Sequence, residues 1–166
     1  CMNITQLYIS GKSAFAADEM NTASRERAHF PLEGMYKVDP EGATGTSNWA
    51  CDLSGHSDRE IAFMSFAYLN DDVKPDMRNL HDVEIVFYQF WTEARLKVRE
   101  IDPENKRVLL SKKAFRPLTW CFGYIIDNVF EGLVKEGTWY FDKPTGKIYY
   151  HALPGETAEN LVARIP

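Results

Sequence analysis

The sequence has no excess of positive charge and no long apolar run. Its 166 residues include 19 Lys and Arg against 24 Asp and Glu, which gives a formal net charge of −5. A chain of net negative charge does not attract a phosphate backbone, so the composition argues against nucleic-acid binding. No apolar stretch approaches the roughly 20 residues that a bilayer-spanning helix requires. We therefore expect neither a nucleic-acid partner nor a membrane span.

Cysteine is scarce, and the usual spacings of metal ligands are missing. The three cysteines, Cys1, Cys51 and Cys121, form no CxxC pair. Neither a disulfide framework nor a zinc site is predicted, and whether two of the three pair as a disulfide stays open. The four histidines are scattered, without an HxH or HxxxH pair. Residues 42–46 are rich in glycine but lack the lysine of a phosphate-binding loop. The sequence thus predicts no metal and no cofactor.

Recognisable catalytic constellations are missing as well. No GxSxG motif occurs, and no cysteine has the histidine spacing of a known nucleophile pocket. Glycosidases use two carboxylates a defined distance apart, and 24 acidic residues would supply such a pair by chance. Asp71-Asp72 and Asp52/Asp58 lie in polar stretches, where we expect them to be solvated. We predict no catalytic residue, and keep a small enzyme with a carboxylate pair as the least favoured alternative.

The most informative stretch that is present is an aromatic hairpin over residues 137–150. Two β-favouring runs, residues 138–141 and 148–150, flank a turn in which Pro144 precedes Gly146. Pro144 presets φ for the first corner, and Gly146 can take the left-handed conformation that closes the turn. A two-stranded unit alone is only marginally stable. We therefore expect this hairpin at the edge of a larger β core.

The N-terminal part contains weaker signals. Residues 6–15 predict a tight hairpin that turns at Ser10-Gly11. Residues 18–60 are polar and interrupted by prolines, which indicates loops with short strands. Residues 61–68 are apolar and aromatic, and they predict a strand.

The central part predicts longer strands. Residues 83–91 form a continuous β-prone run, and residues 94–99 alternate between apolar and basic side chains, as in a strand with one wet face. The change of pattern predicts a bulge or bend at Trp91-Thr92. A turn follows over residues 102–106, in which Asn105 is the residue able to adopt a left-handed conformation.

The C-terminal part predicts the remaining strands and turns. Residues 108–110 predict the partner strand of the turn before them. Residues 124–133 are too short for a long helix, and they predict a helical turn or two that Asp127 caps and Gly132 ends. A turn at residues 153–156 and a last strand at residues 161–165 follow.

Repeated hairpins favour an all-β fold. Turn signals recur about every dozen residues, which is typical of an antiparallel β-sandwich or barrel built of hairpins. One or two short helical turns complete the prediction. At 166 residues we expect one β module over residues 1–166.

The aromatic side chains of the hairpin are the candidate contact residues. Period-2 alternation places Tyr140 on the face opposite Trp139, and Tyr149 opposite Tyr150. About half of these rings should therefore point away from the core. Core packing and contact with a neighbouring domain is one interpretation, and stacking on sugar rings is the other. Outside the hairpin, Trp91 and Trp49 could extend such a platform.

The C-terminal third resembles a known passage. Residues 124–131, the hairpin at 137–150 and Pro154-Gly155-Glu156 are similar to a passage of bacterial secreted proteins built on a right-handed parallel β-helix, of the glycoside hydrolase family 141 and family 120 type. Residues 6–12 and the central segment from Asp82 to Asp102 are similar to further parts of the same module. The resemblance departs at Val134-Lys135-Glu136 and at Thr138, where the turn into the hairpin differs.

The resemblance implies an accessory role. In those proteins the passage belongs to a β-sandwich-like module inserted into the helix, and the catalytic carboxylates are expected on the helix itself. No catalytic residue is carried over to this chain. The resemblance implies a segment excised from a longer protein, a β-helix partner in the same chain, polysaccharide as a further partner, and a secreted, periplasmic or cell-surface location. The first hypothesis is thus a non-catalytic insertion module that shapes or covers a substrate cleft. The alternative is an autonomous carbohydrate-binding module that uses exposed aromatics.

Overall fold

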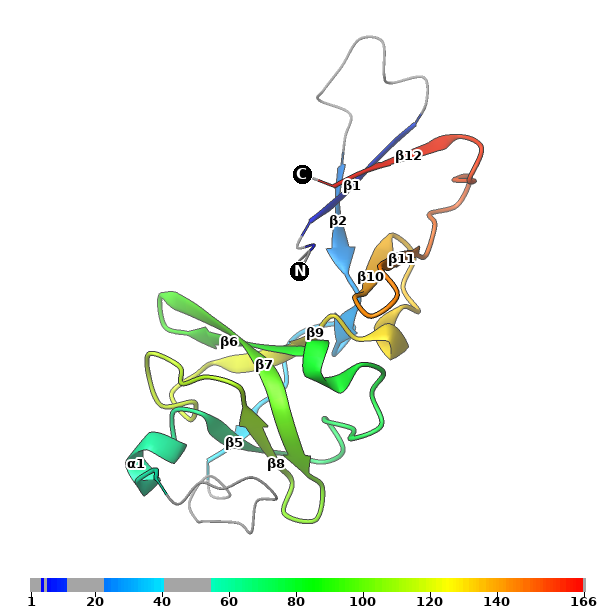
Figure 1. The fold of residues 1–166 in the computed structure, drawn as a ribbon. Coiled ribbons are helices and arrows are strands. Elements are labelled where there is room, and N and C mark those ends of the chain that lie inside the picture. The colour runs from blue at the N-terminus through cyan, green and yellow to red at the C-terminus, as the bar shows by residue number, and fades with distance from the viewer. Residues whose placement is uncertain (1–3, 5, 12–22, 41–54, 166) are drawn as a thin grey trace. The chain divides into compact units, whose positions relative to one another are not determined.

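The computed structural model describes residues 4, 6–11, 23–40 and 55–165. The fold is nearly all β, with strands in two sheets and a few short helical turns, which confirms the predicted class (Figure 1). The turns are α1 (Asp58–Ile61) and the 3-10 segments η3 (Leu80–Asp82) and η4 (Phe130–Gly132). Within these described ranges, no helix has the length and apolarity that crossing a membrane would take.

The first sheet has five strands in the order β11-β10-β2-β1-β12. Its members are β1 (Leu7–Gly11), β2 (Ala23–Arg27), β10 (Thr138–Asp142), β11 (Lys147–Tyr150) and β12 (Leu161–Arg164). Strands β2 and β10 pair in parallel, whereas the other three pairs are antiparallel. The pairing of β1 with β12 brings the first and the last described strand side by side, with Tyr8 opposite Arg164.

The second sheet has seven strands in the order β3-β9-β6-β7-β8-β5-β4 and curls into a half-barrel. Its members are β3 (His29–Phe30), β4 (Val38–Asp39), β5 (Ser65–Tyr68), β6 (Glu84–Gln89), β7 (Thr92–Asp102), β8 (Arg107–Leu110) and β9 (Gly123–Asp127). Neighbouring long strands are antiparallel and mostly joined by short turns, as the hairpin pattern predicts.

The chain divides into two compact units. Unit 1 comprises Cys1–His29 and Asn128–Pro166, and unit 2 comprises Phe30–Asp127. Each unit has buried apolar side chains of its own. The division does not test whether residues 1–166 form one module excised from a longer chain, so that expectation stays a prediction.

The core of unit 1 lies on one face of the hairpin. Trp139 and Phe141 are buried with Ile4, Leu7 and Ile9 from the N-terminal segment. The indole nitrogen of Trp139 donates a hydrogen bond to the carbonyl of Arg25, 2.9 Å away. The hairpin therefore forms one edge of this sheet, as predicted, with β11 as the edge strand and the aromatic β10 between β11 and β2.

The core of unit 2 is built on three aromatic rings. Phe66, Phe87 and Tyr124 are fully buried and meet with centroid separations of 5.0, 4.9 and 5.8 Å. Two of the three contacts are edge-to-face, the favoured arrangement of aromatic pairs. This cluster anchors the centre of the half-barrel.

Two turns confirm the sequence prediction in detail. Gly146 has φ +68 and closes the β10–β11 hairpin, where its amide donates to the carbonyl of Lys143. Gly155 has φ +85 in the turn after the hairpin. The final strand, predicted at residues 161–165, is β12.

The predicted turn at Ser10-Gly11 is wrong. Both residues continue β1, opposite Val162 and Leu161 of β12, and the partner on the other side of β1 is β2. The pairing with a distant strand extends β1 through a dipeptide that local propensity favours as a turn. Residues 12–15, the predicted return strand, lie outside the described residues.

The strand predicted over residues 61–68 is only half correct, since β5 begins at Ser65. Ser57 and Glu60 form a capping box in which each side chain accepts a hydrogen bond from the other's backbone amide. This cap starts α1 and draws Ile61 into it. The pKa of Glu60 is lowered to about 2, by the hydrogen bond from Lys113 first and by those from Ser57 next.

The bend predicted at Trp91-Thr92 is a full chain reversal. Strands β6 and β7 form a two-residue hairpin with Gln89 opposite Thr92, and Phe90 and Trp91 make the turn. The irregularity in β7 lies further on, between Val98 and Glu100. In the next turn the left-handed residue is Lys106, with φ +50, and not Asn105. The backbone amide of Asn105 instead donates to the Asp102 carboxylate.

The short helical turn predicted between Asp127 and Gly132 is present, but it begins later than expected. Residues 123–127 form β9, and only Phe130–Gly132 turns as η4. The N-cap residue of this turn is Val129 and not Asp127, whose carboxylate accepts a hydrogen bond from Arg95. Asp127 is instead the last residue of β9, which pairs with β6 along five residues.

Candidate functional site

The candidate site is an aromatic surface on unit 2. Exposed rings come from two segments, the β6–β7 turn and the loop between β8 and β9. We call their side chains the aromatic surface: Phe90, Trp91, Phe115, Trp120 and Phe122. Trp91 and Phe115 are each 81% exposed, and Trp120 is 56% exposed. A cluster of exposed large apolar side chains of this kind marks a binding surface more often than a single exposed residue does.

The β6–β7 turn presents two of these rings at a conformational cost. Two-residue hairpins favour Asn-Gly or Gly at positions of positive φ. Here Phe90 has φ +40, a region in which bulky side chains are rare. The turn therefore holds a strained backbone while it exposes Phe90 and Trp91, whose ring centroids are 5.8 Å apart. Strain of this kind concentrates at functional positions.

The loop from Ser111 to Phe122 is fixed by backbone hydrogen bonds. The amide of Ala114 donates to the carbonyl of Phe63, and the amide of Leu118 to that of Ala62. The buried side chain of Gln89 donates from Nε2 to the carbonyl of Pro117. A rigid frame thus holds exposed rings in place, and no refolding of the loop is needed to present them.

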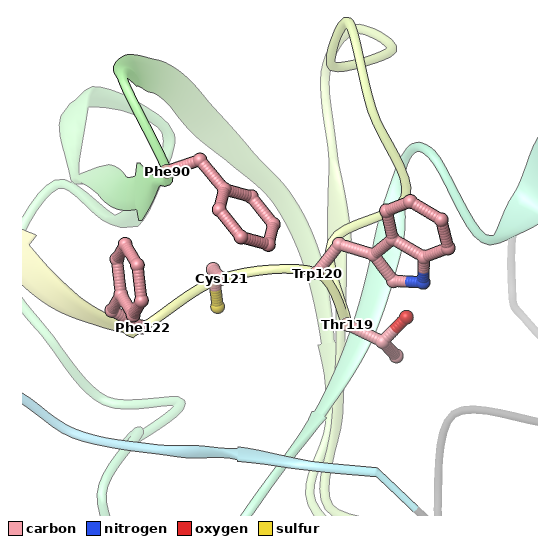
Figure 2. A pocket seen from close by; sticks show the side chains of 5 residues that line it. All are labelled: Phe90, Thr119, Trp120, Cys121 and Phe122. Carbon is pink, nitrogen blue, oxygen red and sulfur yellow. The ribbon is translucent and has the colours of Figure 1, made fainter.

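Three of these rings line an open pocket of about 380 Å³ (Figure 2). It is lined by Phe90, Thr119, Trp120, Cys121 and Phe122. Phe90 and Phe122 meet nearly edge-to-face, with centroids 5.4 Å apart. The polar atoms that Figure 2 shows on these side chains are the Thr119 hydroxyl, the Trp120 indole nitrogen and the Cys121 sulfur. Mostly aromatic walls with a few polar atoms are typical of small-ligand sites.

Cationic groups border the same rings. The Arg116 guanidinium lies 5.9 Å from the ring centre of Trp91 and 5.7 Å from that of Phe115, within cation–π range. The Lys37 ammonium donates a hydrogen bond to the carbonyl of Phe122. Between Ser111 and Ile126 the sequence has Lys112, Lys113 and Arg116 but no acidic residue.

Cys121 is a free thiol at the base of this pocket. Burial raises its pKa above the ordinary value, although the backbone of Gly123 and the charge of Lys37 act in the opposite direction. A thiol with a raised pKa is protonated at neutral pH and is a poor nucleophile. Cys1 and Cys51 lie outside the described residues.

The residues predicted for contact occupy unit 1. Trp139 and Tyr140 are fully buried, whereas Tyr149 and Tyr150 are half-buried. Alternation is as predicted, but the second face is also covered, because Phe130 packs edge-to-face on Tyr140 and Tyr149. A fully buried ring presents no face to a sugar in this structure. The contact role therefore stays a prediction for Tyr149 and Tyr150 in particular.

Tyr150 is also held in a hydrogen-bonded network. Its hydroxyl donates to Glu156 at 2.7 Å and accepts from Arg25 at 2.9 Å. Arg25 pairs with the same carboxylate at 2.9 Å. Burial opposes the ionisation of Glu156, but the hydrogen bonds from Tyr150, Leu153 and Arg25 outweigh it and lower the pKa of Glu156. The network ties the hairpin to β2 and to the following turn.

Two carboxylates on neighbouring strands of unit 2 are bridged by the Arg95 guanidinium. Glu84 and Asp127 lie opposite each other on β6 and β9, and both are buried. The Arg95 guanidinium contacts both carboxylates. Such a bridge compensates both charges, which is typical of a structural ion pair. Asp72 lies near Tyr124, and burial raises its pKa. Asp52 lies outside the described residues.

Four rings of the aromatic surface were missed by the sequence prediction, which named only Trp91. These are Phe90, Phe115, Trp120 and Phe122. Two signals could have found them. The pattern of the β6–β7 region breaks at Phe90-Trp91, and the aromatics after Ser111 lie in the stretch without acidic residues. In the described part of the chain, no group of three or more His, Cys, Asp or Glu side chains is placed to hold a metal.

Comparison with known proteins gives a likeness of structure. No protein-family model matches the chain, and no curated protein matches it. A solved structure described as a glycoside hydrolase matches with a TM-score of 0.57 and 18% sequence identity. The match covers 96% of this chain and 26% of that one, so the chain spans about a quarter of its structural relative. At this identity the likeness shows the fold alone: the chain has a glycoside-hydrolase-related β fold.

Proposed function

We propose that this chain is a non-catalytic accessory module, inserted into a secreted, carbohydrate-active β-helix protein of bacterial origin. There it shapes or covers the substrate cleft. The observation that carries the proposal is the disparity of lengths in the structural match. Nearly all of this chain is similar to a quarter of a glycoside hydrolase, as expected of an accessory part of a larger enzyme.

The sheet of unit 1 supports the insertion. Strands β1 and β12 are antiparallel neighbours, so the chain enters and leaves this sheet at adjacent positions. A module inserted into a loop of another domain needs its two connections close together. The partner in this proposal is the β-helix domain of the same polypeptide, and the location is outside the cytoplasm.

The coding sequence on both sides of residues 1 and 166 provides the test. Repeated short strand-forming coils on each side are the expected finding, because they would build a right-handed β-helix interrupted by this module. A chain that starts and stops at these residues, or flanking sequence of another class, would overturn the insertion.

The aromatic surface favours a second candidate, an autonomous carbohydrate-binding module. Five exposed rings, three of which line a pocket, provide the stacking faces that such a module needs. Retardation of the isolated chain in gels that contain a polysaccharide would support this candidate. An unretarded chain in every polysaccharide of a broad panel would contradict it.

A further inference from the structure

The pocket beside Phe90 and Trp120 has the dimensions and walls of a site for one small ring. Its volume of about 380 Å³ is at the lower end of the range for small-ligand sites. The walls are aromatic faces and edges, and hydrogen-bonding atoms come from Thr119 and Trp120. A pyranose ring matches this chemistry, because it has an apolar C–H face and a rim of hydroxyl groups.

The charge beside the pocket selects among sugars. The chain as a whole carries a net charge of −5, yet the segment from Ser111 to Ile126 has three cationic residues and no anionic one. Lys113 pairs with Glu60, so Lys112 and Arg116 carry the local excess of positive charge. Arg116 lies against Trp91, which in turn contacts Phe90 at the pocket. A cation held next to stacking rings favours a ligand with a carboxylate over a neutral one.

We propose that the aromatic surface binds the uronic acid units of an acidic polysaccharide. One sugar ring lies in the pocket beside Phe90 and Trp120, and the carboxylate of that unit or of its neighbour pairs with Arg116. The inference rests on the carbohydrate context of the proposed function, and it adds the class of sugar and the residues that recognise it.

Packing against the β-helix domain is the competing use of this surface. An interface of that kind would have to bury Arg116, and burying a cation without an anionic partner costs free energy. The strained Phe90 turn also projects two rings outward from the sheet, which suits contact with a mobile polymer. A single-stranded nucleic acid is the other anionic polymer that stacks on aromatics.

Affinity gel electrophoresis of the 166-residue chain tests the inference. The probes are polygalacturonate, the same polymer fully methyl-esterified, and a single-stranded oligonucleotide. We expect retardation by polygalacturonate, with at least threefold weaker binding to the ester and a further loss at high salt, since salt screens exposed charges. Equal binding to acid and ester, no binding to polygalacturonate, or stronger binding to the oligonucleotide would each overturn the inference.

Two variants locate the site. Trp120→Ala should weaken polygalacturonate binding at least tenfold, because it removes one wall of the pocket. Arg116→Gln should weaken binding to the acid about three- to tenfold and leave binding to the ester unchanged. Val134→Ala and Lys147→Gln are matched controls, since both side chains are exposed on unit 1. Equal losses in the controls would overturn the assignment.

Cys121 supplies a readout at the pocket itself. Bound polygalacturonate should slow maleimide alkylation of the Cys121 peptide, measured by mass spectrometry, and the protection should vanish in Trp120→Ala. Circular dichroism confirms that the variants are folded. β-Helix coils in the flanking sequence without polygalacturonate binding would refute this inference alone. Binding without such flanks would refute the insertion and leave the sugar site intact.

Discussion

The aromatic hairpin of unit 1 and the aromatic surface of unit 2 differ in burial. In unit 1, Trp139, Tyr140 and Phe141 lie on a central strand and are buried on both of its faces. In unit 2, Phe90 and Trp91 lie in a tight turn, and Trp120 and Phe122 lie in or beside a loop, where all are exposed. The same residue types therefore serve as core in the hairpin of unit 1 and as surface in this turn and loop of unit 2, whose own core is the cluster of Phe66, Phe87 and Tyr124. Their position relative to the sheet decides the role.

The largest effect should come from deleting the central ring of unit 1. Trp139→Ala removes a fully buried side chain and its hydrogen bond to Arg25. Such a truncation costs about 3–5 kcal/mol of the free energy of unfolding. Urea unfolding followed by circular dichroism measures the loss. A cost below about 1 kcal/mol would show that the unit 1 aromatics are not core.

The second-largest effect should come from breaking the hydrogen-bonded network of Arg25, Tyr150 and Glu156. Glu156→Gln should lower the free energy of unfolding by about 1–3 kcal/mol, because Arg25 keeps its burial but loses an ionic partner. The folded pKa of Glu156 lies below its ordinary value of 4.5. Its contribution to stability is therefore complete above that pH and is lost as the pH falls through the folded pKa. Unfolding measured from pH 7 to pH 3 should be flatter in the variant than in the parent. Tyr150→Phe is the companion variant, and an identical pH profile for Glu156→Gln and the parent would contradict this role.

The β7–β8 hairpin of unit 2 and the β10–β11 hairpin of unit 1 allow the two units to be compared at a single backbone position. Each has a four-residue connection between an Asp and a basic residue, Asp102 to Arg107 and Asp142 to Lys147, and the fourth connecting residue has positive φ. That residue is Lys106 in unit 2 and Gly146 in unit 1. Lys106→Gly should raise the free energy of unfolding by about 0.5–1 kcal/mol, and Gly146→Ala should lower it by about 1 kcal/mol. Opposite signs in urea unfolding support the parallel, and equal signs would break it.

The smallest effect should come from the tip of the aromatic surface. Trp91→Ala removes a ring that is 81% exposed, so the free energy of unfolding should change by no more than about 0.5 kcal/mol. The same urea titration used for Trp139→Ala measures it. A loss as large as that of the buried tryptophan would mean that Trp91 is covered within the protein.

The sequence predicted the class of fold because hairpin signals are local. Pro144 and Gly146 define their turn within a few residues, and the structure confirms it. Prediction failed where distant pairing decided the conformation. Ser10-Gly11 extends a strand because β12 lies beside it, and Asp127 belongs to β9 because β6 pairs with it.

The candidate site was harder to predict, because exposure is a property of the folded chain. Alternation correctly put Tyr140 and Trp139 on opposite faces, but Phe130 covers the face that was expected to be open. The turn at Phe90-Trp91 has none of the usual turn residues, so the change of pattern predicted a bulge or bend there and not a full reversal. The rings that became accessible were therefore not the ones that the hairpin pattern singled out.

Phe90 places stability and recognition in conflict at one residue. Its positive φ is a conformation that glycine adopts without penalty. Phe90→Gly should therefore relax the turn while it deletes one wall of the pocket. Selection for a more robust fold alone would tend to remove this side chain. If the proposed sugar site is correct, Phe90 is kept for ligand contact at the expense of a more stable turn.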